Sequence, residues 1–470
     1  MNLKSILFFL GLFIFPLSGL SFINILYSTY FDYFLNIESY IYTFFLTLVS
    51  GLFFLFYGKN SIKKLSFYDQ ILLIISVYFI SSLFISLPYY LSNYQIIFID
   101  ALFESFSGLT STGFSIFDNI KYLDPTLILW RSSSQWIGGL YFLIFLVIIF
   151  SNNQYKFKLN YLVHTGSTGI FSSSNIKTVL FKIFFVYSLL TILIFIILNI
   201  ADIRLFNSLN LSMTIISNGG FLPTNNLSQI FSDGNKYFLV IVLLIPMLNI
   251  FLIFNLFDRK KLINNHQEDL FLVSFVVFLS LVIFFTFNGI SLTDILINIL
   301  SSLSNSGITL TKSVDGTLFF IILCIIGGSL ISNSSGIKFL RIYILLKAAS
   351  TEIVKLVRPN NVFNNNIFYS EKKIDNQTIN LSFLIFISFF ISLFILSSIL
   401  VLDNISFENS FKISILTLTN TTNSSLYGLA NIDFINFLDS TKFSLIIFMI
   451  IGKIELISIF ILIRNLLIKD

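Results

Sequence analysis

Apolar stretches recur along the whole chain, and their length matches the thickness of a lipid bilayer. A helix that crosses a bilayer needs about 20 consecutive apolar residues. Segments of this kind lie at 5–28, 38–57, 67–90, 127–150, 178–200, 236–256, 269–288, 317–349, 377–402 and 443–466. The pattern predicts an all-α polytopic membrane protein with ten transmembrane helices. Because the number of spans is even, both termini are expected on the same side of the membrane.

The gaps after the third, fifth, seventh and ninth spans share one pattern. Each begins with a half-length amphipathic stretch and ends in a cluster of Ser, Thr, Asn and Gly. The four sequences are IDALFESFSGLTSTGFS, LFNSLNLSMTIISNGGF, LTDILINILSSLSNSGIT and FENSFKISILTLTNTTNSSLYG. Such internal repetition indicates a fold built from repeated units. It divides the chain into an N-terminal helix pair (1–65) and four units of helix, pore loop and helix (66–150, 151–260, 261–358 with an intramembrane gate loop, and 359–470).

Polar loops inside a membrane protein have a restricted physical meaning. Irregular backbone at membrane depth is tolerated only where it is buried in protein or lines water. A half-helix that ends in such a loop would bring carbonyl and hydroxyl oxygens near the middle of the membrane. Four of them around one axis would form a ring of oxygen ligands, which is how selectivity filters hold a dehydrated cation. The four loops therefore predict a cation pathway.

Composition and charge agree with a membrane location. Of the 470 residues, 56% are hydrophobic and only 11% are charged, and the mean hydropathy is +0.90. Soluble domains carry about a quarter charged residues, so that class is excluded. The net charge of +5 comes from Lys and Arg gathered after alternate spans, and the positive-inside rule assigns those segments and both termini to the cytoplasm. Topology thus explains the charge, and the predicted partner is membrane lipid, not nucleic acid.

The acidic residues fall mostly in the outward segments. There they would raise the local concentration of cations, although an acidic residue can also merely be tolerated on that side. Cys324 is the only cysteine, so the sequence offers neither a disulfide nor a cysteine-based metal site. His164 and His266 fall in predicted cytoplasmic loops and are expected to be solvated.

At SLPYYL, FIDALFESFSGLTSTGFS and ILWRSSSQWIGGL the chain resembles the Trk/Ktr/HKT superfamily of potassium transporters, most closely the bacterial TrkH type. The resemblance covers nearly the whole chain. It implies potassium uptake across the bacterial cytoplasmic (inner) membrane, with potassium as the transported ion, no organic cofactor and no enzymatic activity. It also implies a homodimer and a cytoplasmic nucleotide-binding regulatory ring subunit of the TrkA type. The basic segments 156–182 and 338–373 are either its docking surface or topological anchors.

The resemblance also implies which residues form the selectivity filter. Carried over residue by residue, these are Thr110, Ser111, Thr112 and Gly113; Ser217, Asn218, Gly219 and Gly220; Ser304, Asn305, Ser306 and Gly307; and Thr422, Asn423 and Ser424. Three loops supply a filter glycine, whereas the fourth does not. Aligned on Gly428, its filter position falls on Ser424, and a shifted alignment places Thr422 there instead. This departure keeps sodium or mixed potassium and sodium transport as an alternative.

Two polar features inside the apolar spans are further candidate sites. The eighth span is interrupted by Gly327, Gly328, Ser329, Ser332, Asn333, Ser334, Ser335 and Gly336. The resemblance implies an intramembrane gate loop there; a small-residue packing surface is the alternative. Lys453 lies near the middle of the last span, where an ionisable residue indicates function. The resemblance implies a pore barrier at this position, which is usually arginine in the family, and a buried ion pair is the alternative.

Other classes of function fit the pattern less well. A secondary transporter for another solute would carry paired interruptions within its spans, whereas these polar clusters lie mostly between spans. A membrane-embedded enzyme would need several His, Asp or Glu side chains in the bilayer, and the sequence offers only Glu455 there. Whether transport is coupled to protons or sodium stays open.

Overall fold

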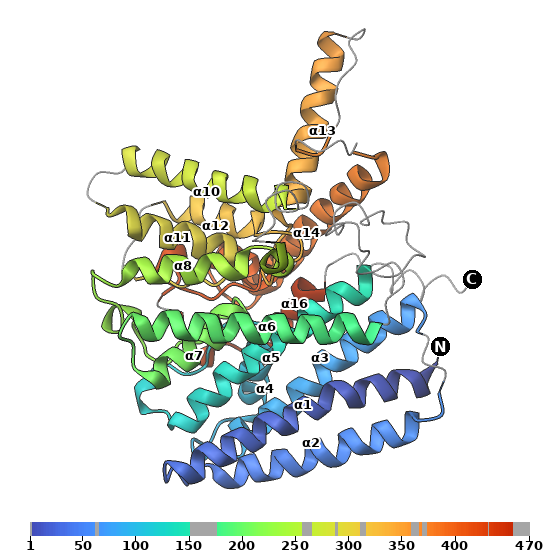
Figure 1. The fold of residues 1–470 in the computed structure, drawn as a ribbon, viewed down its shortest axis with the longest axis vertical. Helices are drawn as coiled ribbons and strands as arrows, with labels where there is room; N and C mark the ends of the chain where they lie inside the picture. Colours follow the sequence, from blue (N-terminus) through green and yellow to red (C-terminus); the bar gives the residue numbers. More distant parts are fainter. Residues whose placement is uncertain are drawn as a thin grey trace.

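The computed structural model describes residues 2–61, 65–150, 176–255, 266–286, 290–310, 316–358, 366–368, 374–430 and 432–454. Over these residues the chain consists of helices joined by turns and short connections. The helices lie side by side in a bundle, and α13 projects from it (Figure 1). The all-α prediction is confirmed.

The helices fall into two length classes. The long ones are α1 (Leu3–Tyr30), α2 (Ile37–Gly58), α3 (Phe67–Tyr90), α5 (Pro125–Phe150), α6 (Ile176–Ile200), α10 (Gln267–Thr286), α13 (Phe339–Val357) and α14 (Asn376–Leu402). The short ones are α4 (Phe98–Leu109), α7 (Leu205–Ile216), α8 (Lys236–Met247), α11 (Leu292–Ser304), α12 (Thr317–Ile326), α15 (Phe407–Leu418) and α16 (Asp439–Ile454). Short 3-10 helices lie at η1 (Ile120–Tyr122), η3 (Leu227–Gln229), η4 (Ile250–Asn255), η5 (Ser425–Tyr427) and η6 (Phe434–Asn436).

Six helices among the described residues are long and apolar enough to cross a membrane. They are α1, α2, α3 from Tyr68, α6 from Leu180, α10 and α14. Their outer faces expose large apolar side chains; Phe53 and Phe56 of α2, for example, are 63% and 82% exposed. Continuous apolar surface of this kind would aggregate in water but suits the hydrocarbon of a bilayer. The chain is a multi-pass membrane protein.

Two of the predicted spans are broken. The predicted span 236–256 consists of α8, which ends just after Pro246, and the 3-10 helix η4. The predicted span 317–349 consists of α12 and α13, separated by residues 327–338. Gly327, at the end of α12, has φ +69°, which takes the chain out of the helix.

The N-terminal pair and the next helix show how the sequence sets local structure. Helices α1 and α2 pack closely at one edge of the bundle (Figure 1). A Cβ added at Gly11 would lie 2.9 Å from the carbonyl oxygen of Gly51, so only a small residue permits this approach. Helix α3 begins with a capping box, in which Ser66 Oγ accepts from Asp69 N (3.2 Å) and Asp69 Oδ2 accepts from Ser66 N (3.3 Å).

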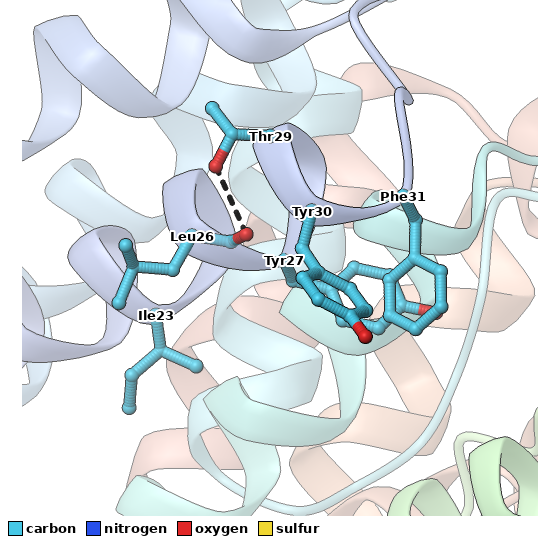
Figure 2. A pocket seen from close by; sticks show the side chains of 6 residues that line it. All are labelled: Ile23, Leu26, Tyr27, Thr29, Tyr30 and Phe31. Carbon is cyan, nitrogen blue, oxygen red and sulfur yellow. Dashed lines mark hydrogen bonds between the residues drawn. The ribbon is translucent and has the colours of Figure 1, made fainter.

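An open, largely apolar pocket of about 530 Å³ lies at the C-terminal end of α1 (Figure 2). Its lining consists of Ile23, Leu26, Tyr27, Thr29, Tyr30 and Phe31. Thr29 Oγ1 donates to Leu26 O at 3.0 Å, and the lining has no carboxylate or amine. Aromatic rings at a helix end are typical of the membrane–water interface, so this pocket belongs to the lipid-facing surface.

Candidate functional site

The four half-length helices α4, α7, α11 and α15 belong to one closed ring of contacts. Helix α4 contacts α5, which contacts α7; α7 contacts α8, which contacts α11; α11 contacts α12, which contacts α15; and α15 contacts α16, which contacts α4 again. The loops that follow these helices are therefore arranged in sequence order, so the first loop lies opposite the third and the second opposite the fourth.

The four loops begin with the same backbone conformation. One residue just after each helix has a left-handed φ: Ser111 (+59°), Asn218 (+55°), Asn305 (+66°) and Asn420 (+47°). The amide of the following residue then donates to a carbonyl five residues back: Thr112 N to Ser107 O (2.9 Å), Gly219 N to Thr214 O (2.9 Å), Ser306 N to Ser301 O (3.0 Å) and Thr421 N to Leu416 O (2.9 Å). Asparagine tolerates left-handed backbone better than most residues, which fits three of the four positions.

This shared conformation sets the register of the loops. The equivalent stretches are 110–113, 217–220, 304–307 and 419–422, hereafter the first to fourth loops. Thr422 is thus level with Gly113, Gly220 and Gly307, as in the shifted alignment. Ser424 lies two residues further on, in extended backbone at the start of η5. Of the four equivalent residues, Gly113 (+81°) and Gly307 (+65°) have positive φ, whereas Gly220 and Thr422 do not.

The ends of the four loops meet. A Cβ added at Gly113 would lie 2.9 Å from the Gly220 Cα and 2.9 Å from the Thr422 Cβ. One added at Gly307 would lie 2.5 Å from the Thr422 Cγ2. The Thr422 hydroxyl donates to Gly113 O at 2.8 Å. All four loops therefore converge on one small region that is buried in protein.

Asparagine amides tie neighbouring loops together. Asn305 Nδ2 donates to Thr421 Oγ1 (3.2 Å), from the third loop to the fourth. Asn420 Nδ2 donates to Thr112 Oγ1 (3.0 Å), from the fourth loop to the first, and also to Met449 O (3.0 Å). In contrast, neither amide atom of Asn218 has a hydrogen-bond partner in the described part of the chain. These asparagine hydrogen bonds therefore join the third, fourth and first loops to one another, whereas Asn218 of the second loop makes none among the described residues.

Hydroxyl oxygens line three of the loops in the same way. The pairs are Thr110 and Thr112 (2.8 Å between the Oγ1 atoms), Ser304 and Ser306 (3.2 Å between the Oγ atoms), and Thr419 and Thr421 (2.9 Å between the Oγ1 atoms). The second loop has Ser217 and Gly219 instead. Backbone carbonyls and hydroxyls are the donor atoms that an alkali cation takes in place of water. Among the predicted residues of the fourth loop, Asn423 donates to Leu429 O (3.3 Å) and does not join these contacts.

Residues 327–338 form a loop that packs directly against the C-terminal ends of the half-length helices α7 and α11. Ser335 N donates to Asn305 Oδ1 in the third loop (3.0 Å). Asn333 Nδ2 donates to Ile216 O, the last residue of α7 (2.6 Å). The predicted gate residues 327–336 therefore contact the end of α7, just before the second loop, and the third loop.

The ammonium group of Lys338 is buried inside this loop. Its Nζ donates to the carbonyl oxygens of Ser329 (3.4 Å), Ser332 (3.2 Å) and Ser334, and to the Ser334 hydroxyl (3.3 Å). A charge surrounded by carbonyl oxygens stabilises a folded-back segment that would otherwise leave those carbonyls without partners at membrane depth.

No family model matches this chain. It is 27% identical to an uncharacterized cation transporter of Methanocaldococcus jannaschii over 91% of this chain and 90% of the relative. It is 25% identical to the Trk system potassium uptake protein TrkG of Escherichia coli over 90% and 91%, and 25% identical to TrkH of Halomonas elongata over 65% and 67%.

A solved structure shares the whole fold. The crystal structure of the potassium transporter TrkH from Vibrio parahaemolyticus superposes with a TM-score of 0.85 over 98% of both chains, at 23% identity. The chain is thus similar in sequence to Trk potassium uptake proteins and shares the fold of one of them. Each of these relatives is named as a cation transporter, a potassium transporter or a potassium uptake protein.

Lys453, the predicted pore barrier, is buried near the end of α16. Its Nζ lies 4.5 Å from the centroid of the Phe142 ring, and the Nζ of Lys338 lies 5.6 Å from the same centroid. The described residues give Lys453 no carboxylate partner, and Glu455 lies outside the described residues. The two ammonium groups therefore approach the same aromatic ring from two elements.

Two of the acidic residues predicted to lie on the outer side are held in ion pairs and are not free to attract cations. Glu104 Oε1 accepts from Arg131 Nε at 2.9 Å, and both side chains are buried. Asp100 Oδ1 is paired with Lys442 Nζ. Asp233, by contrast, is 95% exposed; the hydrogen bond from Lys236 lowers the pKa of its carboxyl below the usual value. Some of the acidic residues that were predicted to concentrate cations therefore form structural ion pairs instead.

The prediction that His266 is solvated is wrong. Its side chain is buried, with Nδ1 3.0 Å from Asp269 Oδ2 and Nε2 2.9 Å from Asn255 Nδ2. It links η4 to the start of α10. His164 and most of the basic segment 156–182 lie outside the described residues.

Proposed function

We propose that this chain carries potassium ions into the cell through a selectivity filter made by the loops 110–113, 217–220, 304–307 and 419–422. The observation that carries the proposal is the convergence of four equivalent, buried, oxygen-rich loops. The relatives named as potassium uptake proteins support potassium as the ion.

The proposed layout is ten membrane crossings, with both termini in the cytoplasm and the chain in the bacterial inner membrane. Four pseudo-repeated units surround one pore, and α1 and α2 form the additional pair. The closed order of helix contacts supports the repeats, and the basic residues after alternate spans support the orientation.

The proposed gate is the segment 327–338, below the filter, with Lys453 as an electrostatic barrier in the same passage. The bonds of this segment to Asn305 and Ile216 support a coupling between gate and filter. We further propose that the chain works as a homodimer, and that a cytoplasmic nucleotide-binding ring subunit of the TrkA type controls the gate.

A second candidate is sodium or mixed transport by the same pathway. One observation favours it: the fourth loop has Thr422 where the other three have glycine, so the ring is not fourfold symmetric.

The test is rubidium uptake by bacteria that lack their own potassium uptake systems and express this chain. Growth at low potassium and saturable rubidium uptake are expected. Sodium uptake in the same cells, measured with a radioactive tracer, identifies the second candidate. Absence of uptake of both ions, with the protein found in the membrane fraction and its proposed ring partner present, would contradict the function.

A further inference from the structure

The Thr422 side chain reaches across the ring. The second and fourth loops lie opposite each other, because the helix contacts close in sequence order. Nevertheless the three atoms closest to a Cβ added at Gly220 are all in the Thr422 side chain: Cβ, Cγ2 and Oγ1. The Thr422 Cγ2 is also the atom closest to a Cβ added at Gly307, and the Thr422 Cβ is 2.9 Å from one added at Gly113. One side chain therefore contacts all three other loops at the same level.

The hydroxyl of Thr422 binds a carbonyl oxygen that would otherwise be available to a cation at this level. It donates to the carbonyl oxygen of Gly113 at 2.8 Å, within a buried environment. A dehydrated cation in a filter needs such carbonyl oxygens as ligands. While Thr422 holds this bond, the oxygen of Gly113 is directed at the hydroxyl, and the methyl group occupies space next to Gly307.

The backbone accepts threonine here without strain. Gly113 and Gly307 have a positive φ, which glycine adopts most easily. The φ of Thr422 is not positive. The departure from glycine therefore acts through the side chain alone, which branches at Cβ and has restricted χ1 freedom.

We propose that Thr422 is the residue that limits the rate and sets the ion preference of this filter: its side chain fills the centre of the ring, and an ion passes only when the side chain turns away from Gly113. The proposal rests on the proposed function of the four loops. It predicts slow passage of the larger alkali cations, because they need the most space between the loops.

The experiment compares the wild type with Thr422→Gly, Thr422→Val and Ser424→Gly in the rubidium uptake assay, at equal amounts of protein in the membrane. Thr422→Gly is expected to raise the rubidium uptake rate several-fold and to raise rubidium uptake relative to sodium. Thr422→Val keeps the volume without the hydroxyl and is expected to be no faster than the wild type. Ser424→Gly tests the other register of the fourth loop.

The outcomes separate the inference from the function. If the wild type takes up rubidium and Thr422→Gly is not faster, or if Ser424→Gly alone is faster, the function stands and the inference is overturned. If none of the proteins transports rubidium or sodium, the function is overturned. Titration calorimetry on the purified proteins then decides the inference: a gain of potassium binding in Thr422→Gly supports it, and potassium binding equal to that of the wild type overturns it. A symmetric elution peak on size exclusion confirms that each variant is folded.

Discussion

Lys442 Nζ lies 2.5 Å from Asp100 Oδ1, and both side chains are almost fully buried. The pair joins α16 to α4, which are the last and first members of the closed ring of helices. Lys442 also donates to Ile435 O at 2.9 Å. The ion pair therefore closes the ring at the contact between its last and first helices.

Breaking this pair should destabilise the protein strongly. Lys442→Met leaves the carboxylate of Asp100 buried without its partner, and this typically costs about 3–5 kcal/mol of unfolding free energy. The expected result is a clearly lower midpoint of thermal unfolding in detergent. Lys355→Met is the matched control, because Lys355 and its partner Glu352 are 44% and 69% exposed and such pairs contribute only about 0–1 kcal/mol. Equal losses in the two variants would contradict a closing role for Lys442.

A second prediction concerns the amide of Asn420, which joins the fourth loop to the first. Asn420→Gly keeps the left-handed backbone but removes two hydrogen bonds, each worth about 1 kcal/mol. Asn420→Ala should lower the free energy of unfolding by about 1–2 kcal/mol more, because alanine is strained at this positive φ. The midpoint of thermal unfolding in detergent is expected to fall in that order.

The matched control is Asn218→Gly at the equivalent position of the second loop. Its amide atoms have no partner among the described residues, so its unfolding midpoint should stay near that of the wild type. If Asn218→Gly is as destabilised as Asn420→Gly, the bonds to Thr112 and Met449 do not hold the ring.

The fold was largely predictable because it depends on local patterns. Apolar runs of bilayer length and four repeated polar clusters specify helices and loops regardless of what they contact. The interruption of the eighth span was visible for the same reason, since Gly327 and Gly336 stand within an apolar run. The sequence could not reveal the Lys442–Asp100 pair, because its partners are 342 positions apart and no periodicity links them.

The register of the fourth loop shows where sequence reasoning needs the structure. Alignment on Gly428 favoured Ser424, but Gly428 has φ +71° because it ends the 3-10 helix η5. Its conformation is unrelated to the ring. A better signal was present in the sequence: Ser217-Asn218, Ser304-Asn305 and Thr419-Asn420 each pair a hydroxyl residue with asparagine at the helix end. That pattern identifies Thr419, Asn420 and Thr421, which the glycine alignment left out.

A third prediction concerns Lys338, whose ammonium group binds the carbonyl oxygens of the proposed gate. Lys338→Met removes these bonds and should loosen the segment 327–338. Rubidium uptake in cells that lack the proposed ring partner is therefore expected to rise above the wild-type level. Lys355→Met is the control, because Lys355 is exposed on α13 and pairs with Glu352. An uptake rate that stays at the wild-type level, with equal protein in the membrane, would mean that Lys338 does not hold the gate closed.

The last prediction concerns the charge of Lys453. Its Nζ and that of Lys338 approach the same Phe142 ring, so two positive charges lie near each other in the proposed passage. A fixed positive charge in a low-dielectric passage repels a permeating cation. Lys453→Gln keeps most of the side-chain volume and removes the charge, and it should raise rubidium uptake. Lys453→Arg keeps the charge and should remain close to the wild type.

Double variants separate a barrier from a structural role of Lys453. If Lys453 acts through its charge, Lys453→Gln should raise uptake in the wild-type background, and more strongly in Thr422→Gly, where Thr422 no longer limits the rate. If Lys453 only supports packing against Phe142, Lys453→Gln should lower the thermal unfolding midpoint in detergent and leave uptake per folded molecule unchanged. Uptake that falls in Lys453→Gln while the unfolding midpoint is unchanged would contradict the barrier directly, because a lost repulsion cannot slow a cation.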